Sequence, residues 1–496
     1  MLRSLRNARR LLGIALILTW EYAPLRARRR PGQKLARALE RLGPAFIKFG
    51  QALSTRSDLI GEQMAEDLGD LRDNLPPFPT AIARATVEAE LGAPVEALFT
   101  EFSATPVAAA SIAQVHRAVT KDGRAVAVKI LRPRIEQAFA RDLDLFFWIA
   151  DIMERRLQGF HRLKPLEVVR TFKESVFFEL DLRFEAAAAN ELAENIKRHD
   201  TGFRVPAVDW QLTSRRVLVT EWIDGLRMND VDAIKASGLN VDAILAKAAR
   251  SLFSQVFRDG FFHADLHPGN LFVDKNGDIV AVDFGIMGRL DWNSRLYIAE
   301  ILRGFLNEDY RHVAEVHFTA GYVPPDKSIE SFTQACMAVA RPITDKPQNE
   351  ISVARLLGQM FAIAAEFEME TQPQLLLLQK TMMVTEGVGR MLNPHLNMWE
   401  LARPLIEDWA SAHFGPMGKL KETAAQGADA VRKLPLMLRY MENALKSLGD
   451  PEGVKLHSLT IAEIHARRRF LTRQWLTLGW TALAVITLLA LTALLR

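Results

Sequence analysis

The stretch "GFFHADLHPGNLFVDKNGDIVAVDFG", residues 260–285, decides the fold of this chain. It sets Asp265, Asn270 and Asp283 among glycines and β-branched residues. An Asn-Gly dipeptide at 276–277 lies between two strand-like segments and supplies the positive φ that a tight hairpin turn needs. This hairpin is predicted to bring Asn270 and Asp283 to one place, where their side chains offer the hard oxygen ligands that Mg²⁺ requires.

A lysine and a glutamate from the upstream half are predicted to meet. Lys129 closes a second hairpin, "VHRAVTKDGRAVAVKIL" at 115–131, which also has an Asp-Gly turn. In the predicted helix that follows, Asp181 and Glu185 share one face at i and i+4 while Glu179 points elsewhere. Like charges at that spacing are unfavourable unless a cation intervenes, and Lys129 can neutralise Glu185. A solvated acidic face is the alternative, but it leaves the matched lysine unexplained.

These pieces share the spacing of the protein-kinase motifs. Kinases use an Asp, an Asn five positions later and an Asp-Phe-Gly, together with a strand lysine that pairs the nucleotide phosphates with a helix glutamate. The analogy predicts that Asp265 aligns the acceptor, that Lys129 and Glu185 orient the phosphates, and that Asn270 and Asp283 hold the metal. We therefore predict Asp265, Lys129 and Glu185 as catalytic residues.

The loop that covers the phosphates in kinases is altered here. Where kinases have G-x-G-x-x-G-x-V, this chain reads "AAASIAQV", with Ala108, Ala110 and Ala113 at the glycine positions. An added Cβ restricts φ and holds such a loop further from the phosphates or in another shape. We predict a modified nucleotide cover formed by Ala108, Ala109, Ala110, Ser111, Ala113 and Val115.

The combination resembles the UbiB family, also called AarF/ADCK, of atypical protein-kinase-like proteins associated with ubiquinone biosynthesis. Its hallmarks here are the alanine-rich loop, the K-x-G-Q motif at Lys48-Phe49-Gly50-Gln51, followed by "ALSTRSDL", and the E-x-D motif at Glu179-Leu180-Asp181. The resemblance covers roughly residues 30–400. Taken together, these motifs are far more specific than any one of them.

The resemblance implies a regulatory role for the K-x-G-Q segment. In the family, this helix covers the place where a protein kinase would bind its peptide substrate, and its lysine reaches the E-x-D acids. The resemblance therefore implies exclusion of protein substrates and regulatory roles for Lys48, Gln51, Glu179 and Asp181. It implies ATP or ADP with Mg²⁺ as cofactors. By the kinase analogy, Thr220 is the gatekeeper, and Glu221 and Ile223 present backbone groups to adenine.

Two departures from these patterns matter. Relatives commonly keep glycine where this chain has Ala113, which bears on the affinity for ATP. The kinase His-Arg-Asp reads His263-Ala264-Asp265, so the arginine that responds to activation-loop phosphorylation is missing.

The C-terminal end is predicted to anchor the protein in a membrane. "WLTLGWTALAVITLLALTALL", from Trp475 to Leu495, is a run of residues without a charge and spans about 30 Å as a helix. Four arginines precede it between 467 and 473 and only Arg496 follows, so the positive-inside rule puts the large N-terminal part in the cytoplasm. A buried helix is the alternative, although every face of the segment is apolar. The resemblance makes the membrane the bacterial inner membrane and leaves one or two crossings open.

The N-terminal end is predicted to form a basic amphipathic helix. The first 30 residues carry eight arginines and one acidic residue, Glu21, around an apolar run from Leu11 to Trp20. No clear cleavage site of a signal peptide follows this run. A helix lying on anionic lipid and a helix docked on the protein itself are equally supported.

Composition excludes several classes of protein. Cys336 is the only cysteine, which rules out an intrachain disulfide and a cysteine-based zinc site. The net charge is +4, from 63 basic and 59 acidic residues, and no basic run is interleaved with aromatics, so no nucleic acid is expected as a partner. We find neither a dinucleotide fingerprint nor a 2-His-1-carboxylate grouping, so a hydroxylase is not supported.

The predicted fold class is α+β, a bilobal protein-kinase-like fold with an N-terminal helical extension and a C-terminal transmembrane helix. Beyond about residue 226 helices dominate, with one short strand pair. The predicted domains are a basic segment 1–33, a helical K-x-G-Q extension 34–106, an N-lobe 107–225, a C-lobe 226–400, a helical region 401–473 and the anchor 474–496.

Two functions remain open at this level. The first is a membrane-anchored, Mg²⁺-dependent phosphotransferase or ATPase that supports ubiquinone synthesis by hydrolysing ATP or phosphorylating a small molecule or lipid. The second is a nucleotide-gated scaffold or lipid-precursor-binding module without net phosphoryl transfer. The resemblance names membrane lipid, polyprenyl-phenol quinone precursors and other enzymes of ubiquinone biosynthesis as partners.

Overall fold

The computed structural model describes residues 2–22, 30–54, 60–69, 71, 75–156, 165–199, 201–344, 363–364, 366–369, 372–395, 401 and 404–409. Contacts divide the chain into two units, Met1–Ser411 and Ala412–Arg496, and every described residue belongs to the first. The predicted membrane anchor 474–496 and nearly all of the predicted helical region 401–473 lie outside the described residues.

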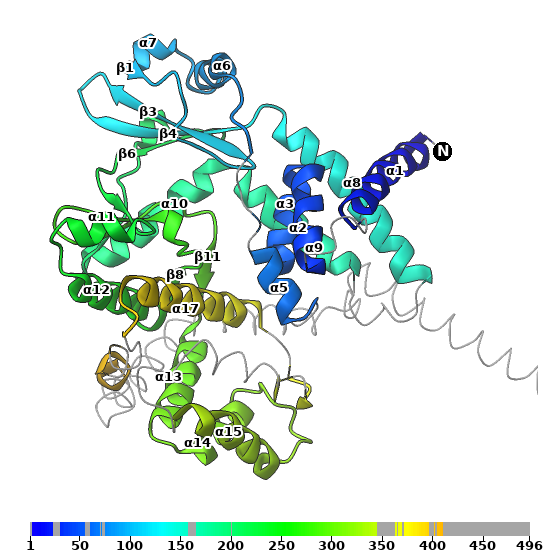
Figure 1. Ribbon diagram of the computed structural model, residues 1–496, viewed down its shortest axis with the longest axis vertical. Coiled ribbons are helices and arrows are strands. Elements are labelled where there is room, and N and C mark those ends of the chain that lie inside the picture. Colours follow the sequence, from blue (N-terminus) through cyan, green and yellow to red (C-terminus); the bar gives the residue numbers. More distant parts are fainter. Residues whose placement is uncertain are drawn as a thin grey trace, which may run out of the picture. The chain divides into compact units, whose positions relative to one another are not determined.

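An antiparallel sheet of five strands forms the core of the N-lobe (Figure 1). Its order is β1-β3-β4-β6, with β2 paired to β3. The strands are β1 (Phe99–Phe102), β2 (Ala108–Ala109), β3 (Ala113–Thr120), β4 (Ala125–Leu131) and β6 (Val217–Glu221). Gly123, in the turn between β3 and β4, has φ +86°, which confirms the predicted Asp-Gly hairpin.

Alternation along β4 decides which way its lysine points. Val126, Val128 and Ile130 are buried on one face, in a core that α6 (Thr80–Leu91) and α7 (Val95–Leu98) cover. Successive side chains of a strand point to opposite faces, so Lys129 lies on the other face. Helix α10 (Leu182–Lys197) contacts β6 of the same sheet and brings its own side chains toward Lys129.

Helices make up most of the C-lobe. They are α11 (Val231–Ala236), α12 (Val241–Phe253), the π-helix η4 (Ser254–Asp259), α13 (Trp292–Leu306), α14 (Tyr310–Thr319), α15 (Ile329–Thr344) and α17 (Pro373–Leu392). Short 3₁₀ turns lie at η3 (Trp210–Leu212) in the N-lobe and η5 (Pro268–Asn270) in the C-lobe.

The C-lobe also holds two small sheets, so the prediction of a single strand pair was wrong. One sheet has the order β5-β10-β9-β7, from β5 (Phe203–Arg204), β7 (Leu226–Arg227), β9 (Leu271–Val273) and β10 (Ile279–Ala281). The other pairs β8 (Phe261–His263) with β11 (Met287–Arg289). Strands of two or three residues are too short to show alternation, so no local pattern reveals them. The predicted β9–β10 hairpin is confirmed, with Gly277 at φ +72°.

Further helices in the described part of the chain precede or flank the N-lobe. They are α1 (Leu2–Tyr22), α2 (Pro31–Leu42), α3 (Pro44–Ser54), α5 (Glu62–Gly69), α8 (Ile135–Arg156) and α9 (Pro165–Glu179). A shared apolar core joins α2, α3, α5, α8 and α9. Helix α3, which carries the K-x-G-Q segment, begins at Pro44, and proline is favoured at the first position of a helix.

The basic helix α1 is docked on the protein along one face. Arg10 donates to the carbonyl of Leu42 at 3.1 Å and pairs with the buried Asp142 at 3.3 Å. Leu16 and Trp20 on the same helix are 64% and 58% exposed. Of the two alternatives, the structure therefore shows the helix docked on the protein. An apolar strip of this helix faces outward.

The chain leaves the helical conformation between α9 and α10, so the prediction of one continuous helix was wrong. Helix α9 ends at Glu179, and Asp181 is the N-cap of α10, accepting a hydrogen bond from the backbone N–H of Arg183. Asp181 and Glu185 therefore do not share a helical face. An aspartate is a favoured N-cap because its carboxylate satisfies a free backbone N–H, and here that preference outweighs the helical periodicity.

No helix among the described residues is long and apolar enough to cross a bilayer.

Burial of His317 on α14 predicts a loss of stability in acid. Burial lowers the pKa of His317 to about 4, although its hydrogen bond to the carbonyl of Val313 opposes the shift. The pKa of His317 in the unfolded chain is about 6.5. Between this pH and about pH 4, the unfolded chain therefore binds a proton at His317 that the folded protein does not bind. We expect the free energy of unfolding to fall by about 2 kcal/mol from this group alone by pH 5.

Urea denaturation of wild type and His317→Phe at pH 7.5 and pH 5 measures this contribution. The variant should lose less stability than wild type on acidification, because phenylalanine takes up no proton. Equal losses in the two proteins would contradict the assignment.

The single cysteine predicts a direct measure of folding. Cys336 on α15 is fully buried, and burial raises the pKa of its thiol to about 12. Because only the thiolate reacts with iodoacetamide, the folded protein should resist alkylation at pH 8 and react rapidly in urea. Mass spectrometry counts the modified fraction, and fast labelling without denaturant would show that α15 is not packed as described.

Candidate active site

The ammonium of Lys129 joins three segments of the chain. Lys129 Nζ donates to both carboxylate oxygens of Glu185, at 2.7 and 2.9 Å, and to Asp283 Oδ1 at 3.2 Å. Strand β4 carries Lys129, the first turn of α10 carries Glu185, and Asp283 follows strand β10. The sequence-predicted lysine, glutamate and metal-binding aspartate are therefore in direct contact.

The charges of Lys129, Glu185 and Asp283 shift one another's pKa values. Burial opposes the ammonium of Lys129, but Asp283 and Glu185 outweigh it and raise the pKa of Lys129. Removal from water would raise the pKa of Asp283, yet Lys129 and then Lys48 lower it to about 2. The side chain of Asp283 nevertheless remains 48% exposed, so a carboxylate that the two lysines keep ionised is still partly open to solvent, as its predicted role as a metal ligand requires.

Asp283 has a backbone conformation that non-glycine residues seldom adopt. Its φ is +67°, in the left-handed region, and its carboxylate accepts from the backbone N–H of Gly285 at 3.4 Å. Next to it, the ring of Phe284 packs against His263 with centroids 5.4 Å apart. Strain of this kind is retained where the surrounding structure fixes it and is concentrated at functional sites.

Asp265 and Asn270 lie on one loop that turns back on itself. The backbone N–H of Asp265 donates to His263 Nδ1 at 3.1 Å, and Asn270 Nδ2 donates to the carbonyl of Asp265 at 3.4 Å. Val282 N donates to the carbonyl of Asn270 at 2.8 Å, which sets Asn270 beside the residue preceding Asp283. The loop thereby brings the predicted acceptor-aligning and metal-binding residues together.

A lysine that the sequence analysis missed completes this loop. Lys380 Nζ on α17 donates to Asp265 Oδ1 at 3.0 Å. The two residues lie far apart in the sequence, and Lys380 sits in an ordinary apolar helix with no motif around it. No local signal in this sequence could have paired the two residues.

The donor set fits a metal that arrives with a nucleotide. Among the described residues no three His, Cys, Asp or Glu side chains gather into a group that could hold a metal ion. Mg²⁺ in phosphate-transfer sites is bound through one or two protein oxygens together with phosphate oxygens and water. Asn270 and Asp283 offer such a partial set, and Lys129 adds the positive charge that phosphates require.

The alanine-rich loop is a short hairpin that is held by hydrogen bonds from Arg132. Ala110 N donates to the carbonyl of Ala113 at 2.7 Å, and Arg132 donates to the carbonyl of Ala110 at 2.8 and 3.0 Å. Of the six predicted loop residues, Ser111 and Ala113 are buried in the protein, whereas Ala108, Ala109, Ala110 and Val115 are exposed or half-buried. Arg132 was not among the predicted site residues.

The two residues predicted to contact adenine differ in which of their backbone groups could still bind a base. The backbone N–H of Glu221 donates to the carbonyl of Ala207 at 2.8 Å, and the Glu221 side chain pairs with Arg204 at 2.8 Å. Only the carbonyl of Glu221 is then left for a base. Ile223 follows the end of β6, and its N–H enters no backbone hydrogen bond within the described part of the chain.

The K-x-G-Q helix is tied to the E-x-D segment by one ion pair. Lys48 Nζ lies 2.8 Å from Glu179 Oε2, and each side chain is 13% exposed. Asp181 pairs instead with Arg183 at 2.7 Å, so Lys48 meets the first acid of the motif and not the second.

Gln51 lies half-buried one turn further along α3. A Cβ on Gly50 would clash with the side chains of Leu71 and Leu39, which explains the glycine by close packing of leucine side chains.

The chain is similar to known families and proteins over most of its length. The model of the ABC1 atypical kinase-like domain matches residues 70–317, and that of the UbiB helical domain matches residues 336–397. A "Probable protein kinase UbiB" of Marinobacter nauticus is 42% identical over 90% of this chain and 82% of its own length. Proteins of the same name from Shewanella piezotolerans and Aeromonas salmonicida are 41% and 42% identical, each over 82% of this chain and 75% of their own length.

The chain therefore belongs to the UbiB family of ABC1 atypical kinase-like proteins, and it has a kinase-like α+β fold. This confirms the resemblance found in the sequence motifs. Among solved structures, the Rv3197–erythromycin complex of Mycobacterium tuberculosis is 24% identical, with a TM-score of 0.49, and covers 72% of this chain and 90% of its own.

The Lys48–Glu179 pair predicts a coupled loss of stability. Because both side chains are nearly buried, removing one partner leaves the other poorly solvated, so Lys48→Met and Glu179→Gln should each cost about 2 kcal/mol. The double variant should cost clearly less than the sum of the two. Urea denaturation of the four proteins measures the coupling.

A surface pair provides the control. Arg311 on α14 pairs with Glu315 at 2.9 Å and with Glu330 at 3.3 Å, all three side chains are at least half exposed, and Arg311→Met should leave the stability almost unchanged. Strictly additive effects at Lys48 and Glu179 would contradict an energetic link between α3 and the E-x-D segment.

Proposed function

We propose that this protein is a membrane-anchored atypical kinase or ATPase that binds Mg-ATP and supports ubiquinone biosynthesis. The observation that carries the proposal is the contact of Lys129 with both Glu185 and Asp283. Such an arrangement orients a nucleotide's phosphates and places a metal-binding carboxylate next to them. The link to ubiquinone rests on membership of the UbiB family.

Each site residue has one task in the proposed reaction. Lys129, held by Glu185, binds the α- and β-phosphates, and Asn270 with Asp283 would hold Mg²⁺. The metal, when bound, neutralises negative charge on the phosphates. Asp265 aligns the attacking water or hydroxyl group. Catalysis then consists of positioning and charge neutralisation, without a covalent intermediate on the protein.

The K-x-G-Q helix favours a small molecule or a lipid as the acceptor. The Lys48–Glu179 pair fastens α3 to the end of α9, and Lys48 is close enough to lower the pKa of Asp283. A helix fastened in this way would occupy the approach that an extended peptide needs, as the family resemblance implies.

An aromatic surface beside the E-x-D motif also suits an apolar acceptor. Phe177, Phe178 and Phe184 are 53%, 60% and 52% exposed, and the rings of Phe178 and Phe184 lie 5.0 Å apart. Exposed aromatics gathered around a site are uncommon on surfaces that face only water. They support an acceptor of the polyprenyl-phenol type.

The membrane part of the proposal rests on the sequence. The uncharged run from Trp475 to Leu495 and the arginines before it support a C-terminal anchor with the kinase-like domain on the cytoplasmic side of the bacterial inner membrane. The outward-facing Leu16 and Trp20 on α1 would support contact with the same lipid surface.

The second candidate is a nucleotide-gated scaffold or lipid-binding module without net phosphoryl transfer. The observation in its favour is the altered phosphate cover, in which Ser111 and Ala113 are buried and the loop is held by Arg132. All metal- and phosphate-binding positions are nevertheless present, and this favours the enzyme.

Nucleotide binding and hydrolysis by the detergent-purified protein, with and without liposomes that contain a polyprenyl phenol, test the proposal. Asp283→Asn should weaken Mg-dependent ATP binding at least about tenfold and abolish turnover, because it removes the charged metal ligand. Asp278→Asn is the matched control, since Asp278 pairs with Lys247 in the hairpin turn outside the site.

The outcomes separate the candidates. Full Mg-ATP binding and turnover by Asp283→Asn would show the proposed mechanism to be wrong. Intact nucleotide binding by wild type without turnover under any lipid condition would favour the scaffold.

A further inference from the structure

The helix α17 contributes a charged side chain to the catalytic loop. Lys380 Nζ lies 3.0 Å from Asp265 Oδ1, and the two side chains are each 33% exposed. We propose that Lys380 is a positioning residue that orients the carboxylate of Asp265 toward the acceptor, which makes α17 part of the reaction centre. This inference rests on the proposed function, in which Asp265 aligns the attacking group.

The main chain and the side chain of Asp265 are held by different parts of the protein. Its backbone N–H and carbonyl bond to His263 and Asn270, both within the same loop. Its carboxylate, by contrast, bonds to Lys380 from α17. Contacts near Asp265 in the sequence therefore fix its backbone position, and the contact with α17 fixes the orientation of its carboxylate.

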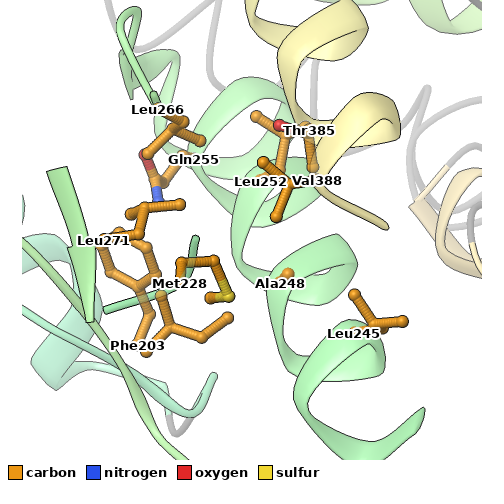
Figure 2. A pocket seen from close by; sticks show the side chains of 11 residues that line it. Phe203, Met228, Leu245, Ala248, Leu252, Gln255, Leu266, Leu271, Thr385 and Val388 are labelled. Atoms are coloured by element: carbon orange, nitrogen blue, oxygen red, sulfur yellow. The ribbon is translucent and has the colours of Figure 1, made fainter. Parts of the chain in front are cut away.

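Packing holds α17 against this loop and keeps the lysine in reach. Thr385 and Val388, on the same helix as Lys380, line a small cavity of about 20 Å³ together with Leu266, the residue after Asp265 (Figure 2). Helix α17 also contacts α12 and strand β11. The lining of the cavity is almost wholly apolar, so the cavity is no site for a polar ligand.

Charge supplies a reason for a lysine at this position. Residues 260–270 contain neither lysine nor arginine, so the loop has no cation of its own beside Asp265. Lys129 is engaged by Glu185 and Asp283, and Lys48 by Glu179. Within the described part of the chain, Lys380 thus supplies an ammonium on the acceptor side, where it holds the carboxylate of Asp265.

Steady-state ATP hydrolysis and nucleotide affinity of full-length Lys380→Met, Lys380→Arg and Lys327→Met test the inference. Lys380→Met should lower kcat between about 10- and 100-fold while the Kd for Mg-ATP changes less than about 2-fold, because the lysine acts on the acceptor side. Lys380→Arg should recover part of kcat. Lys327→Met removes an equivalent lysine that pairs with Glu368 and should match wild type.

Protection of Cys336 from alkylation verifies that each variant is folded. A kcat of Lys380→Met within 2-fold of wild type, or a parallel loss of kcat and nucleotide affinity with no recovery by arginine, would overturn the inference. If wild type shows no turnover, the proposed function fails separately. The contact is then decided by the thermal stability of Lys380→Met, Asp265→Asn and the double variant, since additive shifts would exclude it.

Discussion

The ion pair between Lys129 and Glu185 is the interaction on which the site depends. An ammonium held in a largely buried position costs several kcal/mol unless a carboxylate is placed against it, and two oxygens of Glu185 meet Lys129 within 2.9 Å. This requirement fixes the docking of α10 on the sheet. It also fixes the position of Asp283, whose carboxylate meets the same ammonium and thereby links the C-lobe hairpin to the N-lobe strand.

The family's own additions are built around that junction as further lysine–carboxylate pairs. Lys48 on α3 reaches Glu179, only six positions before Glu185, so α3 is fastened to the segment that carries the partner of Lys129. Lys380 on α17 reaches Asp265 on the opposite side. Three lysines from three distant segments therefore pair with the acids of one site.

Much of this site could be predicted from local sequence. Asp-Gly and Asn-Gly dipeptides mark both hairpins because few residues tolerate positive φ, and proline marks the start of α3. The break before α10 was missed because a helical period extends across it, and only the capping of Arg183 N by Asp181 decides against a continuous helix. The strands of the C-lobe were missed because they are two or three residues long.

By itself, the sequence determined the identities and spacing of Lys129, Glu185, Asp265, Asn270 and Asp283, because turn chemistry and side-chain periodicity act over a few residues. Only the tertiary structure decided that Lys48 pairs with Glu179 and not with Asp181, that α1 docks through Arg10, and that Lys380 holds Asp265. Contacts of this kind join residues far apart along the chain. Their geometry depends on how whole helices pack, and no short stretch of sequence encodes that packing.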